Sequence, residues 1–134
     1  MNPTQNTVTL DPTTADVLDR AADHIERHGF NQGTYYDNAA AECPAACTAG
    51  AIAIAAYGYP AWIPEYVTGW GHAEYTDAFE WMQGYLAANL DRYAGQSIGV
   101  YAWNDSPHTT GMDVVDTLRA AAAAWRVENQ GGEV

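Results

Sequence analysis

The segment from Ala45 to Tyr57 constrains the fold of this chain more than any other part of the sequence. It consists almost entirely of small or apolar residues, and no charged side chain interrupts it. A helix that is apolar on every side belongs in the centre of a helical bundle. The segment has about 13 residues, whereas a membrane-spanning helix needs about 20. We therefore predict a central helix that starts at Pro44, ends at Tyr57 and is followed by Gly58 as its stop.

Aromatic side chains must supply the bulk of the remaining core, because aliphatic residues are scarce. Leu, Ile, Val and Phe together account for 20 of the 134 residues. That share is about 15%, below the roughly 20% under which a highly charged chain tends toward disorder. The chain also has 5 Trp and 9 Tyr, and each such side chain buries roughly 150–250 Å². The composition thus predicts one folded domain with an alanine-rich centre and an aromatic shell.

Three further helices are predicted from apolar residues spaced three and four apart. The first begins with Asp11 as its N-cap and ends at Gly29 in a left-handed cap. The second covers about 73–93, and the last begins at Thr110, which pairs with Asp113 in a capping box. The expected apolar positions on these helices are Leu18, Ala21, Ala22, Ile25, Tyr75, Phe79, Met82, Leu86, Leu90, Tyr93, Val115, Leu118, Ala122 and Trp125.

The segments between these helices are irregular. Residues 31–42 contain turn formers and allow at most a short strand or hairpin. Residues 59–71, named here the aromatic loop, are rich in Pro, Gly, Trp and Tyr, and 97–103 fit either a strand or a packed turn. We therefore expect a mainly α, single-domain bundle of about four helices. Its parts are a polar N-terminal lead (1–10), the helical domain (11–128) and a C-terminal tail (129–134).

The charge of the chain restricts its partners. The chain has seventeen acidic residues, five arginines and no lysine, which gives a net charge of -12. Duplex binders need clustered cations, so direct nucleic-acid binding is not expected, and anionic membranes are disfavoured for the same reason. The acidic residues recur at helical intervals and predict either a solvated face or a surface for a basic protein. They are Asp16, Asp19, Asp23 and Glu26, followed by Glu74, Asp77 and Glu80.

Two cysteines raise the question of a metal site. Cys43 and Cys47 occur in a chain whose first residues lack a secretion signal, which predicts reduced thiols in the cytosol. His24 and His28 have the same spacing of four, and two Cys with two His form a common tetrahedral zinc set. However, Cys43 precedes a helix-starting proline, and structural zinc sites use a two-residue Cys spacing in a loop. We expect no metal or cofactor, and zinc on these four residues is the alternative.

Cys47 is also the candidate nucleophile of a cysteine-dependent enzyme. A thiol near a helix N-terminus has a lowered pKa. His108 or His72 would serve as the base, and Asn104 or Asp105 as the orienting group. The sequence shows no nucleophile elbow, phosphate-binding loop or His-Glu-x-x-His motif in support. The competing interpretation is that Cys47 is a small buried side chain.

The candidate binding residues are aromatic or lie next to an aromatic residue. Trp103 is followed by the turn formers Asn104 and Asp105. In one interpretation these two residues bond nearby backbone amides and fix the approach to the last helix. In the other, the three residues form an exposed polar edge that binds a ligand. Trp62 and Trp70 of the aromatic loop complete this candidate surface.

Three blocks of the sequence carry a family resemblance. They are residues 21–33, the Cys-x-x-Gly-Ala segment that starts at Cys47, and Trp103-Asn104-Asp105 with the helix that follows. Together they resemble a domain-of-unknown-function family, numbered 6197, from actinobacteria and their phages. The resemblance covers about residues 16–126, and Cys43 is extra to the family pattern. It implies a small, largely helical protein of bacterial or phage origin and supplies no activity.

Three functions follow from these observations. The first is a small acidic cytosolic accessory protein, of bacterial or phage origin, that binds another protein, with a basic protein as the candidate partner. The second is a cysteine-dependent enzyme that uses Cys47. The third is an acidic decoy for a nucleic-acid-binding protein. The sequence leaves the oligomeric state open.

Overall fold

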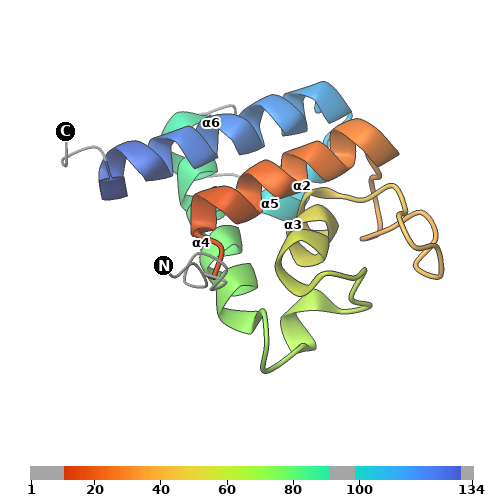
Figure 1. The fold of residues 1–134 in the computed structure, drawn as a ribbon. Helices are drawn as coiled ribbons and strands as arrows, with labels where there is room; N and C mark the ends of the chain where they lie inside the picture. The colour runs from red at the N-terminus through yellow and green to blue at the C-terminus, as the bar shows by residue number, and fades with distance from the viewer. Residues whose placement is uncertain (1–10, 91–98, 131–134) are drawn as a thin grey trace.

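The computed structural model describes residues 11–90 and 99–130 (Figure 1). The elements of these segments are α2 (Thr14–His28), α3 (Thr48–Tyr57), the 3-10 helix η1 (Pro64–Tyr66), α4 (His72–Asn89), α5 (Val100–Asp105) and α6 (Gly111–Gln130). Within the described residues, β pairing is limited to isolated bridges from Ala46 to Phe30 and to Tyr36. The fold is mainly α, as predicted, and the hairpin considered for 31–42 is absent.

The long helices α2 and α6 lie side by side and run antiparallel, and α4 crosses behind them (Figure 1). Their buried residues include the positions predicted from the apolar spacing, such as Leu18, Met82 and Leu118. The indole N–H of Trp81 on α4 donates to the carbonyl of Ala121 on α6 at 2.9 Å. Apolar periodicity therefore identified the core faces of all three helices.

The alanine-rich α3 packs against α2, α4 and α5. Ile52 is completely buried, and alanines on either side of it leave room for the neighbouring backbones. Gly58 ends the helix in the left-handed conformation, with φ 90° and ψ 4°, as predicted. The central position inferred from the all-round apolar sequence is thus where the helix lies.

The predicted start of α3 at Pro44 is wrong, because the helix begins at Thr48 with Cys47 as its N-cap. Ala46 pairs with the segment that directly follows α2. Its amide donates to the carbonyl of Gly29 at 3.1 Å, and its carbonyl accepts from the amide of Asn31 at 3.0 Å. Tertiary pairing therefore outweighs the helix-starting preference of the proline.

Other helix boundaries also differ from expectation. The N-cap of α2 is Thr13 instead of Asp11, because Thr13 and Asp16 exchange reciprocal hydrogen bonds of 3.0 Å. Gly29 has a positive φ of 108°, but its ψ of 162° is extended and therefore outside the left-handed helical region. Tyr93, predicted as the last apolar position of α4, lies outside the described residues.

The region after residue 98 also differs in part from expectation. Residues 100–105 form the short helix α5, so neither the predicted strand nor the packed turn is present there. The capping box of the last helix is confirmed, since Thr110 and Asp113 exchange bonds of 3.0 and 3.1 Å. The helix itself continues to Gln130 and so includes the first two residues of the expected tail.

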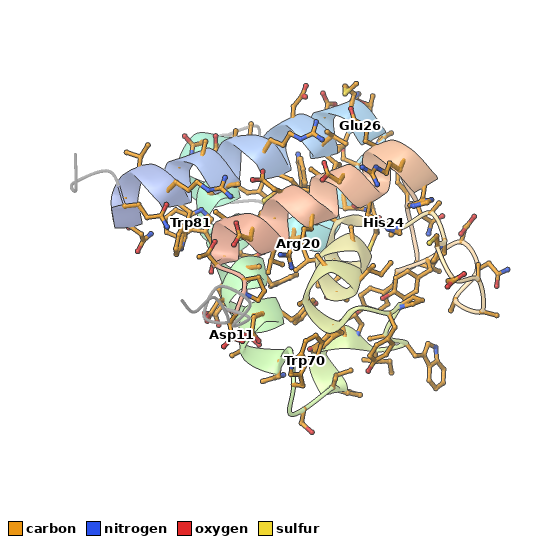
Figure 2. All side chains as sticks on the ribbon, viewed as in Figure 1. Asp11, Arg20, His24, Glu26, Trp70 and Trp81 are labelled. Carbon is orange, nitrogen blue, oxygen red and sulfur yellow. The ribbon has the colours of Figure 1, made fainter. Side chains whose placement is uncertain are left out.

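The acidic residues of α2 form ion pairs with α6 within the same chain. Figure 2 shows Glu26 on the edge of α2 that faces α6. The four pairs are Arg119–Glu26 (2.8 Å), Arg119–Asp23 (2.9 Å), Arg126–Asp19 (2.7 Å) and Arg126–Asp16 (3.1 Å). Exposed pairs of this kind contribute at most about 1 kcal/mol each to stability. A nucleic-acid decoy needs a row of unpaired carboxylates, and α2 does not offer one.

Among the described residues, no helix combines the length and the apolar character needed to span a lipid bilayer.

Candidate functional site

A pocket of about 200 Å³ opens where the loop after α2, the start of α3 and α5 meet. Its lining residues are Gly33, Thr34, Tyr35, Cys47, Tyr101, Asn104 and Asp105. The structure therefore brings together Cys47, Asn104 and Asp105, three of the residues singled out from the sequence. Neither His72 nor His108, the candidate bases, lines the pocket.

The side chain of Asn104 is buried and forms hydrogen bonds to three parts of the chain. Its Oδ1 accepts from the backbone amide of Thr48 at 2.8 Å and from the Thr48 hydroxyl at 2.7 Å. Its Nδ2 donates to the carbonyl of Asn31 at 3.2 Å and to Asp105 Oδ1 at 2.9 Å. Every polar atom of this side chain is therefore used in holding the N-terminus of α3, the loop after α2, and α5 together.

Asp105 closes one side of the pocket. Its Oδ1 accepts from the backbone amide of Gly33 at 2.9 Å, in addition to Asn104 Nδ2. No residue that the structure describes donates to its Oδ2, and the side chain is exposed. Oδ1 of Asp105 thus holds the loop and α5 together, whereas Oδ2 is open to a ligand.

Trp103 does not form the exposed edge considered from the sequence. Trp103-Asn104-Asp105 is the last turn of α5, and the Trp103 side chain is only 1% exposed. Because the indole packs in the core, it anchors α5 instead of contacting a ligand. Asn104 and Asp105 do accept hydrogen bonds from backbone amides, but these amides belong to Thr48 and Gly33, more than 50 positions away, and not to the approach to the last helix.

Gln32 is a positioning residue that the sequence analysis missed. Its Nε2 donates to the carbonyls of Asn104 and Ser106, each at 2.9 Å, at the C-terminal end of α5. These carbonyls lack partners inside so short a helix, and an outside donor satisfies them. The only sequence signal was a polar residue in a turn, which does not reveal a partner about 70 positions away.

Cys47 is poorly suited to act as a nucleophile. Its Sγ accepts from the amide of Gly50 at 3.3 Å, but burial outweighs this hydrogen bond and raises the pKa of the thiol to about 11. At neutral pH only about one such thiol in ten thousand is ionised. With no histidine in the pocket lining to take its proton, the geometry does not support the cysteine enzyme.

The two cysteines are expected to differ strongly in reactivity. Cys43 is exposed and Cys47 is buried. At neutral pH, iodoacetamide should modify Cys43 in the native protein and reach Cys47 only after denaturation, because the thiolate is the reactive species. Peptide mass spectrometry over a time course measures both rates. Rapid native labelling of Cys47 would restore the enzyme hypothesis.

The four zinc candidates do not converge. His24 Nε2 donates to the carbonyl of Pro44 at 2.6 Å, and its pKa is lowered by burial. Cys43 is exposed, whereas Cys47 faces the pocket described above. Among the described residues, no group of three or more His, Cys, Asp or Glu side chains is arranged to hold a metal ion.

The aromatic loop displays its largest side chains to solvent. Trp62, Tyr66 and Trp70 are 79%, 76% and 74% exposed, and Tyr59 is about half exposed. Figure 2 shows Trp70 on the side of the molecule away from α6. These three side chains of the aromatic loop are therefore open to solvent and lie outside the core.

The backbone that carries these rings is fixed to the core. The buried hydroxyl of Tyr36 donates to the carbonyl of Ala61, and that of Tyr57 donates to the carbonyl of Pro64, each at 2.8 Å. His72 Nδ1 contacts the carbonyl of Val67 at 2.7 Å. The exposed rings thus lie beside residues whose backbone is anchored.

The pocket and the aromatic loop are in direct contact. The hydroxyl of Tyr35, on the pocket wall, donates to Glu65 Oε1 of the aromatic loop at 2.9 Å. The rings of Tyr35 and Tyr101 meet edge to face with centroids 6.2 Å apart. The candidate site therefore consists of an aromatic loop and an adjoining pocket with acidic groups.

Comparison with known proteins identifies the family of this chain. A family of unknown function, DUF6197, matches residues 9–124. No curated protein and no solved structure matches the chain. The matched region includes α2 to α5, the pocket, the aromatic loop and most of α6. The chain belongs to DUF6197, a family of unknown function.

Proposed function

We propose that this protein is a small accessory protein that binds a basic protein partner through the aromatic loop. The observation that carries the proposal is the exposure of Trp62, Tyr66 and Trp70, each about three quarters exposed on an anchored backbone. Exposed apolar patches mark interaction sites, and these three side chains lie within nine positions of one loop. Tryptophan and tyrosine are enriched among the residues that dominate binding energy at protein interfaces.

The anchoring of the loop supports a binding role over accidental exposure. A loop that is already held in place loses little conformational entropy when a partner docks. Three core contacts, from Tyr36, Tyr57 and His72, hold the backbone at Ala61, Pro64 and Val67. The backbone that carries the rings is therefore held in place before any partner arrives.

The charge of the chain favours a basic partner over a second copy. The chain carries a net charge of -12, and Glu65 is the one ionisable acid or base other than tyrosine in residues 59–71. Complementary charge speeds association and discriminates between partners. Two copies of so acidic a chain repel each other, so the occupant of this surface is a different protein. Five arginines and no lysine are too few cations to favour nucleic acid or an anionic membrane as the partner.

The remaining features fit a cytosolic accessory protein. Both cysteines are free thiols, which is the usual state in the reducing cytosol. The resemblance to family 6197 leads us to place the protein in actinobacteria or their phages.

Comparative capture tests this function. We expect an immobilised wild-type chain to retain a basic protein from a lysate of its source cells, and that protein, once purified, to bind directly in calorimetry. The double variant Trp62→Ser/Trp70→Ser should weaken binding at least about tenfold, since buried aromatic anchors commonly contribute 2 kcal/mol or more. The matched control is Met112→Ser/Val127→Ser, whose original side chains are exposed elsewhere.

Two results would overturn the proposal. One is equal binding of the captured protein by the aromatic variant and the control. The other is self-association of the wild-type chain that the aromatic substitutions abolish, measured by sedimentation. Circular dichroism checks that all variants keep their helices, as expected for exposed positions.

A further inference from the structure

The pocket beside the aromatic loop has the chemistry of a cation site. Asp105 is the one formally charged residue in its lining, and Glu65 adjoins it through the hydroxyl of Tyr35. No arginine or histidine lines it. An anionic occupant would face Asp105 in a chain that already carries a net charge of -12, so the occupant is a cation.

The hydroxyl groups of the pocket wall are arranged as acceptors. Tyr35 donates its proton to Glu65, and the oxygens of Tyr35 and Tyr101 lie 3.3 Å apart. Because the Tyr35 proton is already committed, the Tyr101 hydroxyl donates to the Tyr35 oxygen. The hydroxyl of Tyr75 also hydrogen-bonds to Tyr101, so Oδ2 of Asp105 is the main acceptor that remains for an N–H donor. Burial raises the pKa of Tyr35, so this phenol stays protonated and keeps its bond to Glu65.

Aromatic faces select an organic cation over a metal ion. Tyr35 and Tyr101 both line the pocket, and a cation is attracted to the face of a tyrosine ring when it lies within about 6 Å of the centroid. The described residues around the pocket do not supply the three acidic or Cys/His ligands that a metal ion needs. A planar guanidinium both stacks on aromatic rings and donates several hydrogen bonds.

The size of the pocket limits the occupant to about one side chain. Its volume is about 200 Å³, below the roughly 300–1,000 Å³ of sites for drug-sized ligands. An alkylguanidinium group fits this limit, and a nucleotide or sugar nucleotide exceeds it. Because the pocket adjoins the aromatic loop, a protein that covers the loop can reach it with one side chain.

We propose that this pocket binds the guanidinium group of an arginine side chain that the basic partner inserts beside the aromatic loop. The inference rests on the proposed function, because the arginine belongs to the basic partner proposed there. The binding of a guanidinium group to the pocket can be tested without that partner. Asp105 supplies charge and an acceptor, Tyr101 supplies an aromatic ring to the pocket wall, and Tyr35 connects the pocket to Glu65.

The test uses nuclear magnetic resonance titration of the full chain with three probes: methylguanidinium chloride, neutral methylurea, and arginine blocked at both ends as N-acetyl-arginine methylamide. We expect methylguanidinium and blocked arginine to shift the amide resonances of Gly33 and Asp105 with saturation, and methylurea to leave them unchanged. Sodium chloride at equal concentration controls for ionic strength.

Variants assign the binding to the named side chains. Asp105→Asn keeps an acceptor oxygen for Gly33 and Asn104 but removes the charge, and it should weaken methylguanidinium at least about tenfold. Asp116→Asn, an exposed carboxylate on α6, removes the same charge elsewhere and should bind like wild type. Tyr101→Leu should weaken binding, whereas Tyr101→Phe, which keeps the ring, should weaken it less.

The possible outcomes separate this inference from the proposed function. If methylguanidinium shifts the amide resonances and blocked arginine does not, the claim that an arginine side chain occupies the pocket is overturned. No saturable shift by either cation, or equal binding by methylurea, would overturn the cation pocket. The Trp62→Ser/Trp70→Ser variant should bind methylguanidinium like wild type, so a failed capture experiment leaves the pocket result standing, and the reverse also holds.

Discussion

Replacing Asn104 by alanine is expected to lower the free energy of unfolding by about 3–5 kcal/mol. The substitution leaves the backbone amide and the hydroxyl of Thr48 without their acceptor in a buried position. It also frees the carbonyl of Asn31 and Oδ1 of Asp105 from their donor and creates a cavity. Each unsatisfied buried group costs about 1–3 kcal/mol, which is a large part of the roughly 5–15 kcal/mol that stabilises a domain.

Urea denaturation followed by circular dichroism measures this loss. Asn89→Ala is the matched control, because Asn89 is exposed at the end of α4 and should change stability by about 0.5 kcal/mol or less. A loss below about 1 kcal/mol for Asn104→Ala would show that Asn104 does not hold α3 and α5 together.

The second large effect is expected at Gly50 of α3. A Cβ atom built there would lie 2.5 Å from the carbonyl oxygen of Tyr35 and 2.9 Å from a ring carbon of Tyr36. That carbonyl cannot simply move away, because it accepts from the amide of Cys47 at 2.8 Å. Overpacking costs about 1–3 kcal/mol, the strained hydrogen bond adds about 1 kcal/mol, and the usual gain from glycine to alanine in a helix offsets about 0.5–1 kcal/mol. Gly50→Ala should therefore destabilise the protein by about 1–3 kcal/mol.

Gly84 provides the matched comparison for Gly50. It also lies inside a helix, α4, but a Cβ atom there would meet nothing within 4 Å. Gly84→Ala should therefore stabilise the protein by about 0.5–1 kcal/mol, the usual difference between glycine and alanine in a helix. Thermal and urea denaturation of both variants measures the sign of each stability change. Equal shifts in the same direction would contradict the close approach at Gly50.

Apolar spacing predicted the helix faces because it is a local property, whereas capping residues predicted the helix ends only in part, since the N-cap of α2 is Thr13 and not Asp11. Leu18 and Leu118 are buried where the spacing placed them, and Thr110 caps α6 as expected. The start of α3 could not be predicted in this way. Pro44 is a good first-turn residue, but the pairing of Ala46 with Gly29 and Asn31 depends on a loop whose path the sequence does not show.

The candidate site could be predicted only in part, because local motifs identify some of its residues and tertiary contacts bring in the others. Cys47, Asn104 and Asp105 were named from short motifs, and they meet at one pocket. The burial of Trp103 was not foreseen, because α5 has only six residues and shows no helical period. Tyr35 and Glu65 were not named at all, since an exposed hydroxyl–carboxylate contact across 30 positions leaves no pattern in the sequence.

Site-specific photocrosslinking tests the central claim, that the aromatic loop is the surface that contacts a partner. A benzophenone side chain would replace Trp62 in one chain and Met112 in another, since both side chains are exposed. Illumination in a lysate of the source cells is expected to attach a basic protein at position 62 and not at position 112, as mass spectrometry would show. The same adducts at both positions, or an adduct at position 62 that consists only of a second copy of this chain, would contradict the account.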